Sequence, residues 1–133
     1  MAAGIVVDTS IIIAHLRART RTATDFERAV KSGRTCHVSA VSVWEIEYGA
    51  IRAGRLSDLD HILPLVNVLP FGFREAQIAA RIYAELKLRS RDIGIRDAFI
   101  AGTCLAHNFP LLTANVGHFA SVPGLEVLGR FRG

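Results

Sequence analysis

The sequence predicts an α/β protein with three α/β/α layers, in which helices cover both faces of a central parallel sheet. Short apolar runs typical of buried strands alternate along the chain with segments whose apolar residues recur at helical spacing. Half of the 133 residues are hydrophobic and the mean hydropathy is +0.31, which supports a packed interior. The length is that of one domain, so we expect residues 1–133 to form a single one.

The first half of the chain contains two predicted strands and the helices that follow them. Hydroxyl side chains stand where helix N-caps are expected, at Thr9, Ser10 and Thr24. Gly33 and Gly54 stand where helices should end, since glycine adopts the left-handed C-cap conformation. The expected order is a strand at 4–8, a helix at 11–16, a loop at 17–21, a helix at 24–30, a strand at 35–39 and a helix at 40–53.

The second half continues the alternation of helices and strands. Its clearest helix carries Ile78, Ile82 and Leu86 at helical spacing. The expected order is a helix from Ser57 to Leu63 with Pro64 near its end, a strand at 66–70, a helix at 74–89, a polar loop at 90–95, a helix at 97–107, a strand at 110–114, a turn at 116–119 and a strand at 125–128. Such alternation implies right-handed crossovers between parallel strands.

Composition narrows the classes of function. Sixteen Lys and Arg against twelve Asp and Glu give a net charge of +4, which favours an anionic partner such as nucleic acid. No apolar run reaches the ~18 residues of a membrane helix, and no basic segment precedes the first apolar run, so we expect a soluble protein without a membrane partner. Cys36 and Cys104 lie in apolar stretches and predict buried free thiols in a reducing compartment, the cytoplasm.

Three acidic residues fall at the edge of the sheet where ligands bind. Asp8 ends the first strand, Glu45 lies early in the helix after the second, and Asp97 opens the helix before the fourth; Asn115 follows the fourth strand. Each also has a structural explanation, because Asp is a favoured N-cap and Ser42-x-x-Glu45 has the spacing of a capping box. Spacing alone does not separate Glu45 from Glu47.

Gathered at one edge, these carboxylates predict a metal site. Carboxylates about 5 Å apart repel by ~3 kcal/mol per pair at an effective dielectric of 20, and a divalent cation offsets that repulsion. Oxygen ligands without nearby His or Cys suit Mg²⁺ or Mn²⁺, which engage substrate phosphates. Such a site fits metal-assisted hydrolysis of phosphodiesters, while the basic surplus holds the nucleic acid.

Four ordered motifs resemble the PIN-domain family, and most closely the VapC-type toxins of bacterial toxin–antitoxin pairs. They cover nearly the whole chain: Val6-Val7-Asp8-Thr9-Ser10, Ser39-x-x-Ser42-x-x-Glu45-Ile46-x-x-Gly49, Ile95-Arg96-Asp97-Ala98-x-Ile100-Ala101 and Leu112-Thr113-x-Asn115-x-x-His118-Phe119. The resemblance implies a PIN-like fold, Mg²⁺- or Mn²⁺-dependent endoribonuclease activity and a homodimer. It also implies neutralisation by a cognate antitoxin, and contact with DNA only through that antitoxin.

The resemblance also implies roles for individual residues. Asp8, Glu45 and Asp97 match the acidic catalytic and metal-binding positions, and the family pattern is what selects Glu45 over Glu47. Ser10 matches a hydroxyl position beside the first acid. Asn115 stands where the family often has a fourth acid, so the number of bound metal ions, one or two, stays open. Asn115 would instead position the substrate or the metal's water.

Alternatives come from other classes of protein. The neutral Asn115 motivates a co-repressor that binds an antitoxin and has weak or vestigial nuclease activity. A haloacid-type phosphatase needs a second acid where Ser10 stands, and a receiver domain needs an acid beside Asp8 and a later lysine, so neither fits. The helix at 41–51 is apolar on two sides, which predicts a dimer or antitoxin contact. Arg17, Arg19 and Arg21 are candidates for RNA contact or for a solvated loop, and Asp92 is expected to be solvated.

Overall fold

The computed structural model describes residues 4–131, which fold around a parallel sheet. Its strands lie in the order β3-β2-β1-β4-β5, and every neighbouring pair is parallel. The strands are β1 (Ile5–Val7), β2 (Cys36–Ser39), β3 (Asn67–Leu69), β4 (Leu111–Leu112) and β5 (Val127–Leu128). The predicted α/β fold with a parallel sheet is confirmed.

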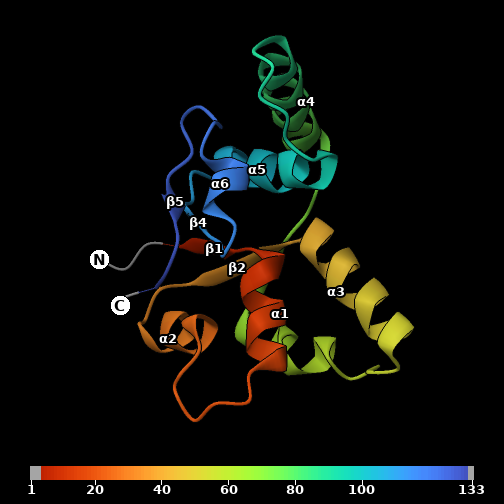
Figure 1. Cartoon of the computed structure of the whole chain (residues 1–133), viewed down its shortest axis with the longest axis vertical. Coiled ribbons are helices and arrows are strands. Elements are labelled where there is room, and N and C mark those ends of the chain that lie inside the picture. The colour runs from red at the N-terminus through yellow and green to blue at the C-terminus, as the bar shows by residue number, and fades with distance from the viewer. Residues whose placement is uncertain (1–3, 132–133) are drawn as a thin grey trace.

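Helices lie on both faces of the sheet (Figure 1). One face is covered by α1 (Thr9–Arg17) and α2 (Asp25–Lys31), with α3 (Ala40–Ala53) beside α1. The other face is covered by α5 (Ile95–His107) and α6 (Val116–Phe119), while α4 (Phe73–Leu88) packs along α5 and projects from the body of the protein.

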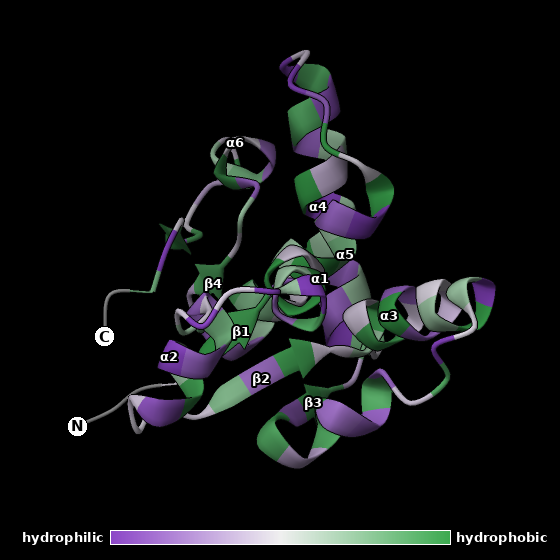
Figure 2. Cartoon of the chain, turned by 60° about the horizontal axis from the view of Figure 1, so that its bottom comes forward, coloured by the Kyte–Doolittle hydropathy of each residue, from purple (hydrophilic) through white to green (hydrophobic). Residues whose placement is uncertain are grey.

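The strands separate two apolar cores because successive side chains point to opposite faces. Ile5 and Val7 pack with α1 and α2, whereas Val6 between them packs with α5. Figure 2 shows hydrophobic strands at the centre. Both cysteines are buried and free, as predicted. Burial raises the pKa of each thiol.

Several element boundaries agree with the sequence and others differ. Thr24 caps α2 in a reciprocal box with Glu27, and Gly54 ends α3 at φ 71°. The expected helix from Ser57 to Leu63 is wrong, because that segment forms two 3₁₀ turns, η1 (Leu59–His61) and η2 (Leu63–Leu65). Pro64 explains the break, since it lacks the amide hydrogen that a continuous α-helix would need at this position. No helix within residues 4–131 has the length and apolarity needed to cross a membrane.

Candidate active site

The direction of winding reverses at β1. The chain runs from β1 outward to β2 and β3, and then returns to place β4 on the other side of β1. Ligands in open α/β sheets bind at such a switch point, beyond the carboxyl ends of the strands. Asp8 follows β1 and Thr113 follows β4, and the Asp8 amide donates to the Leu112 carbonyl over 2.9 Å. Both side chains are therefore held at the expected ligand crevice.

Asp8 is buried, with 4% of its surface exposed. It occupies the N-cap position of α1, but its carboxylate makes no capping hydrogen bond. Instead, Oδ2 accepts from the Ser10 hydroxyl over 2.7 Å and from the Thr113 hydroxyl over 2.8 Å. The structural explanation of this aspartate as a helix cap thus fails, and so does the expectation that Thr9 and Ser10 cap α1, because both lie inside that helix.

Glu45 lies in the second turn of α3, where the predicted capping box does not form. The N-cap of α3 is Ser39, whose hydroxyl accepts from the Ser42 amide over 3.0 Å. Glu45 instead accepts from the Thr9 hydroxyl over 2.7 Å and from Nε of Arg96 over 3.1 Å. These contacts connect Glu45 to α1 and α5, at the edge of the sheet that carries Asp8.

Asp97 is the third residue of α5, whose N-cap is Gly94. Its Oδ2 lies 3.2 Å from Nδ1 of His118 on α6. Burial, followed by the negative charge of Asp8, raises the pKa of Asp97, while His118 and Arg96 oppose the shift. The charge of Asp8 therefore reaches Asp97, although the two aspartates lie far apart in the sequence.

The two predicted positioning residues differ in how firmly they are held. The Ser10 hydroxyl donates to Asp8 and accepts from the Ala114 amide over 3.0 Å. Asn115 is exposed at the same edge, and its backbone amide donates to the Thr113 hydroxyl over 3.0 Å. The loop after β4, which carries Asn115, is thus tied to Asp8 through Thr113 and through Ser10 of α1.

Four side chains that contact the acids were not among the predicted site residues. They are Thr9, Arg96, Thr113 and His118. Thr9 and Arg96 stand next to Asp8 and Asp97 in the quoted motifs, and Thr113 and His118 stand in the motif around Asn115, so position in a motif was the available signal.

The donor chemistry fits a hard cation, since carboxylate and hydroxyl oxygens are what Mg²⁺ prefers. No three His, Cys, Asp or Glu side chains within residues 4–131 lie close enough together to hold an ion, so the structure does not gather Glu45 with Asp8 and Asp97 into one cluster. The charge of Asp8 reaches Asp97, while the Glu45 carboxylate is engaged by Thr9 and Arg96. Such a site fits an ion that keeps several waters rather than one fully enclosed by protein.

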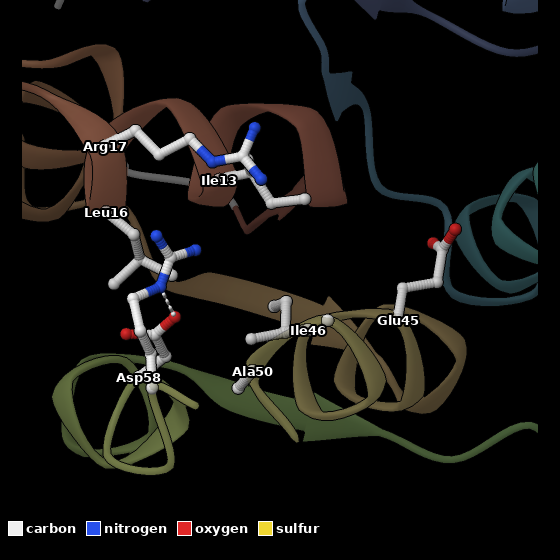
Figure 3. Close-up of a pocket in the computed structure, with 9 residues that line it drawn as sticks. Ile13, Leu16, Arg17, Glu45, Ile46, Ala50 and Asp58 are labelled. Atoms are coloured by element: carbon white, nitrogen blue, oxygen red, sulfur yellow. Dashed lines mark hydrogen bonds and ion pairs between the residues drawn. The ribbon is translucent and has the colours of Figure 1, made fainter. Parts of the chain in front are cut away.

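A narrow pocket between α1 and α3 begins at Glu45 (Figure 3). Its volume is about 40 Å³, and Ile13, Leu16 and Ile46 are among the residues that line it. An ion pair of Arg55 with Asp58, 3.1 Å between Nε and Oδ2, lies toward its other end. This volume is too small for a nucleotide. Arg17, Arg19, Arg21 and Asp92 are all exposed, and Arg17 belongs to the last turn of α1 rather than to the loop.

The PIN-domain family model matches residues 5–125 of the sequence. The chain belongs to the PIN-domain family. Among its relatives is the Ribonuclease VapC of Rickettsia bellii, 32% identical over 127 residues that cover 94% of this chain and 95% of the relative. Ribonuclease VapC1 of Rickettsia felis is 33% identical over 132 residues, with the same coverage. The predicted resemblance to VapC-type proteins is confirmed.

Solved structures show the same PIN fold. VapBC2 from Rickettsia felis, bound to a DNA fragment from its promoter, superposes with a TM-score of 0.82 at 21% identity, covering 93% of this chain and 96% of that one. VapBC from Salmonella typhimurium, also bound to DNA, superposes with a TM-score of 0.82 at 22% identity, covering 96% and 97%. At these identities the likeness concerns the fold.

Proposed function

We propose that this PIN domain is a Mg²⁺- or Mn²⁺-dependent endoribonuclease and the toxin of a toxin–antitoxin pair. The observation that carries the proposal is the pair of interacting aspartates, Asp8 and Asp97, at the switch point of the sheet, with neither carboxylate used to cap a helix. The relatives named ribonuclease VapC support RNA as the substrate, and the net charge of +4 favours a polyanion.

Asp8, Glu45 and Asp97 would hold the cation. When bound, it would activate a water molecule and stabilise the negative charge that develops on the phosphate. Ser10 and Thr113 orient the Asp8 carboxylate, Thr9 orients Glu45, and His118 orients Asp97. Ser10 and Asn115, at the rim of the site, would position the substrate or the metal's water.

Glu45 and Glu47 provide a matched test of these roles, since both lie on α3 and only two residues apart. Glu45→Gln should lower RNA cleavage at least 100-fold and weaken Mn²⁺ binding measured by calorimetry, because the neutral amide is a poorer ligand. Glu47→Gln should leave both unchanged. Equal activity of the two variants would contradict the assignment of Glu45.

We further propose a homodimer, a cognate antitoxin as partner, contact with DNA only through that antitoxin, and a cytoplasmic location where RNA is accessible. The support is the exposed face of α3, where Tyr48 is 49% and Ile51 60% exposed, while Ile46 on the other face is buried in the core. Because Ile46 is buried, a charge placed there would disturb folding and would not test the contact, whereas Ile51 is exposed. Ile51→Glu should shift the sedimenting species toward monomer, and unchanged sedimentation with unchanged antitoxin binding would count against this face.

A co-repressor with weak or vestigial nuclease activity is the second candidate. It is favoured by the ion pair of Glu45 with Arg96 and by the neutral Asn115 at the rim. If the site is impaired in this way, Asn115→Asp should strengthen Mn²⁺ binding and raise cleavage. Strong cleavage by the unmodified protein would remove the reason for this candidate.

A further inference from the structure

Glu45 is the proposed metal ligand that stands apart from the other two acids. Both of its carboxylate oxygens are engaged by side chains of other helices. Oε1 accepts from the Thr9 hydroxyl over 2.7 Å, and Oε2 accepts from Nε of Arg96 over 3.1 Å. Within residues 4–131, no three acidic, histidine or cysteine side chains gather closely enough to hold an ion. The carboxylate that would complete the metal site is therefore held by contacts of its own.

The two partners of Glu45 differ in how they would respond to a metal ion. Thr9 is a neutral, buried hydroxyl, so it can go on donating to the carboxylate when a cation binds there. Arg96 carries a full positive charge, and like charges within a few ångströms repel each other. A divalent cation that binds Glu45 must therefore displace Arg96 from Oε2.

The preferences of a helix do not explain why an arginine stands at position 96. Arg96 is the second residue of α5. The backbone amides of a helix create a positive potential at its N-terminus, where an anion is favoured and a cation is not. Asp97, the next residue, has the favoured sign, whereas Arg96 has the wrong one. The ion pair with Glu45 offsets this cost, so the acidic site accounts for Arg96 better than the helix does.

The charge of Arg96 also reaches a second acid. Burial, followed by the charge of Asp8, raises the pKa of Asp97, and Arg96 is among the groups that oppose the shift. The guanidinium thus favours the ionised form of Asp97 while it pairs directly with Glu45. One side chain therefore compensates the negative charge of two of the three acids, as a bound metal ion would.

The ion pair is exposed enough to open without unfolding of the chain. The Arg96 side chain is 57% exposed and that of Glu45 is 23% exposed. The guanidinium carbon lies 5.8 Å from the centre of the Trp44 ring, and this contact does not involve Glu45. Ion pairs near solvent contribute little to stability, so a divalent cation can compete with this one.

We propose that Arg96 is an internal cation that competes with the metal ion for Glu45. In the metal-free chain Arg96 would neutralise Glu45, and a bound metal ion would take its place on Oε2. Metal binding has to break this contact, so Arg96 raises the metal concentration at which the site is completed. This inference rests on the proposed metal-dependent function and adds how that site is regulated.

Removal of the Arg96 charge should tighten metal binding. The probe is Mn²⁺ titrated calorimetrically into the full chain without RNA. Arg96→Gln should bind Mn²⁺ about 2- to 5-fold more tightly than the parent protein, as expected for the loss of a competing, partly exposed ion pair. Arg89→Gln is the matched control, because Arg89 pairs with Glu85 over 3.2 Å on α4, and it should leave the affinity unchanged. Equal affinity of Arg96→Gln and the parent protein would overturn the proposal.

A double-mutant cycle separates the contact with Glu45 from a general effect of positive charge. Glu45→Gln removes the charge with which Arg96 pairs. In that background, Arg96→Gln should tighten Mn²⁺ binding by a clearly smaller factor than in the parent protein. The same factor in both backgrounds would show that Arg96 acts at long range and does not compete for Glu45, which would overturn the proposal.

Two outcomes distinguish failure of this inference from failure of the proposed function. Metal-dependent RNA cleavage together with unchanged Mn²⁺ affinity in Arg96→Gln would overturn the competition and leave the ribonuclease intact. Tighter Mn²⁺ binding by Arg96→Gln, without RNA cleavage by any variant, would support the competition and contradict the ribonuclease. A lower half-maximal Mn²⁺ concentration for cleavage by Arg96→Gln would support both.

Discussion

The Thr113 hydroxyl donates to the Asp8 carboxylate over 2.8 Å and so joins the ends of β4 and β1 at the switch point of the sheet. Thr113 is fully buried and also contacts the Ser10 hydroxyl and the Asn115 amide. One side chain therefore orients the first acid and contacts both predicted positioning residues, Ser10 in α1 and Asn115 in the loop after β4.

Thr113→Val should keep the fold and impair the site. The isosteric valine removes one of the two hydroxyl donors to Asp8 and the acceptor of the Asn115 amide, which should cost about 1–3 kcal/mol of unfolding free energy and at least 10-fold in RNA cleavage. Urea denaturation and cleavage assays measure the two effects. Thr103→Val is the control, since the buried Thr103 hydroxyl bonds only to the carbonyl of Phe99 in its own helix, and it should leave cleavage intact.

Stability should depend on pH through Glu75 at the start of α4. Hydrogen bonding to its own backbone amide lowers the pKa of Glu75, burial opposes the shift, and the bond to His107 adds to the lowering. Because the pKa is lower in the folded state, the carboxylate stabilises the fold above its unfolded pKa, and this contribution is lost as the pH falls through the folded pKa.

Glu75→Gln tests this dependence. Urea denaturation should show the variant less stable than the parent protein at neutral pH, with the two converging as the pH falls below the lowered folded-state pKa of Glu75. Glu85→Gln is the control, because Glu85 pairs with Arg89 at an exposed position where ion pairs contribute little. A constant difference between parent and Glu75→Gln at every pH would show that Glu75 does not titrate in this way.

The contact between α4 and α5 depends on Gly102. A Cβ placed there would lie 2.8 Å from the Cβ and the backbone nitrogen of Ala79, so Gly102→Ala should lower the unfolding free energy by about 1–3 kcal/mol. Gly49→Ala in α3 meets no atom within 4 Å and should be neutral or raise stability by up to ~1 kcal/mol. Thermal unfolding compares them, and the same sign for both would contradict the close packing.

Most of the fold was predictable because strands and helices carry different apolar periods. The bounds of α3 agree fully, since Gly54 marks its end and apolar residues mark both its faces. The two 3₁₀ turns in the segment 57–65 were not predictable in this way. Ser57 is a good helix cap locally, but the effect of Pro64 on the preceding turn prevents a continuous α-helix.

The sequence predicted which edge of the sheet carries the site and which acids lie there. It did not predict the hydrogen-bond partners of those acids. Strand order follows from tertiary packing, so only the structure places β4 beside β1 and Thr113 against Asp8. The capping box expected at Ser42 failed because Ser39, three residues earlier, caps α3 and releases Glu45 to meet Thr9. The sequence spacing is equally compatible with Ser39 and with Ser42 as the N-cap of α3.

The most direct test of the account is cleavage of total cellular RNA by the purified chain. With Mg²⁺ or Mn²⁺ we expect discrete fragments, and no cleavage with EDTA or with Asp97→Asn, which removes the carboxylate beside Asp8 while keeping its shape. Circular dichroism confirms that the variant is folded. Cleavage that persists in Asp97→Asn or in EDTA, or no cleavage by the folded, metal-binding parent protein, would contradict a metal-dependent ribonuclease built on these acids.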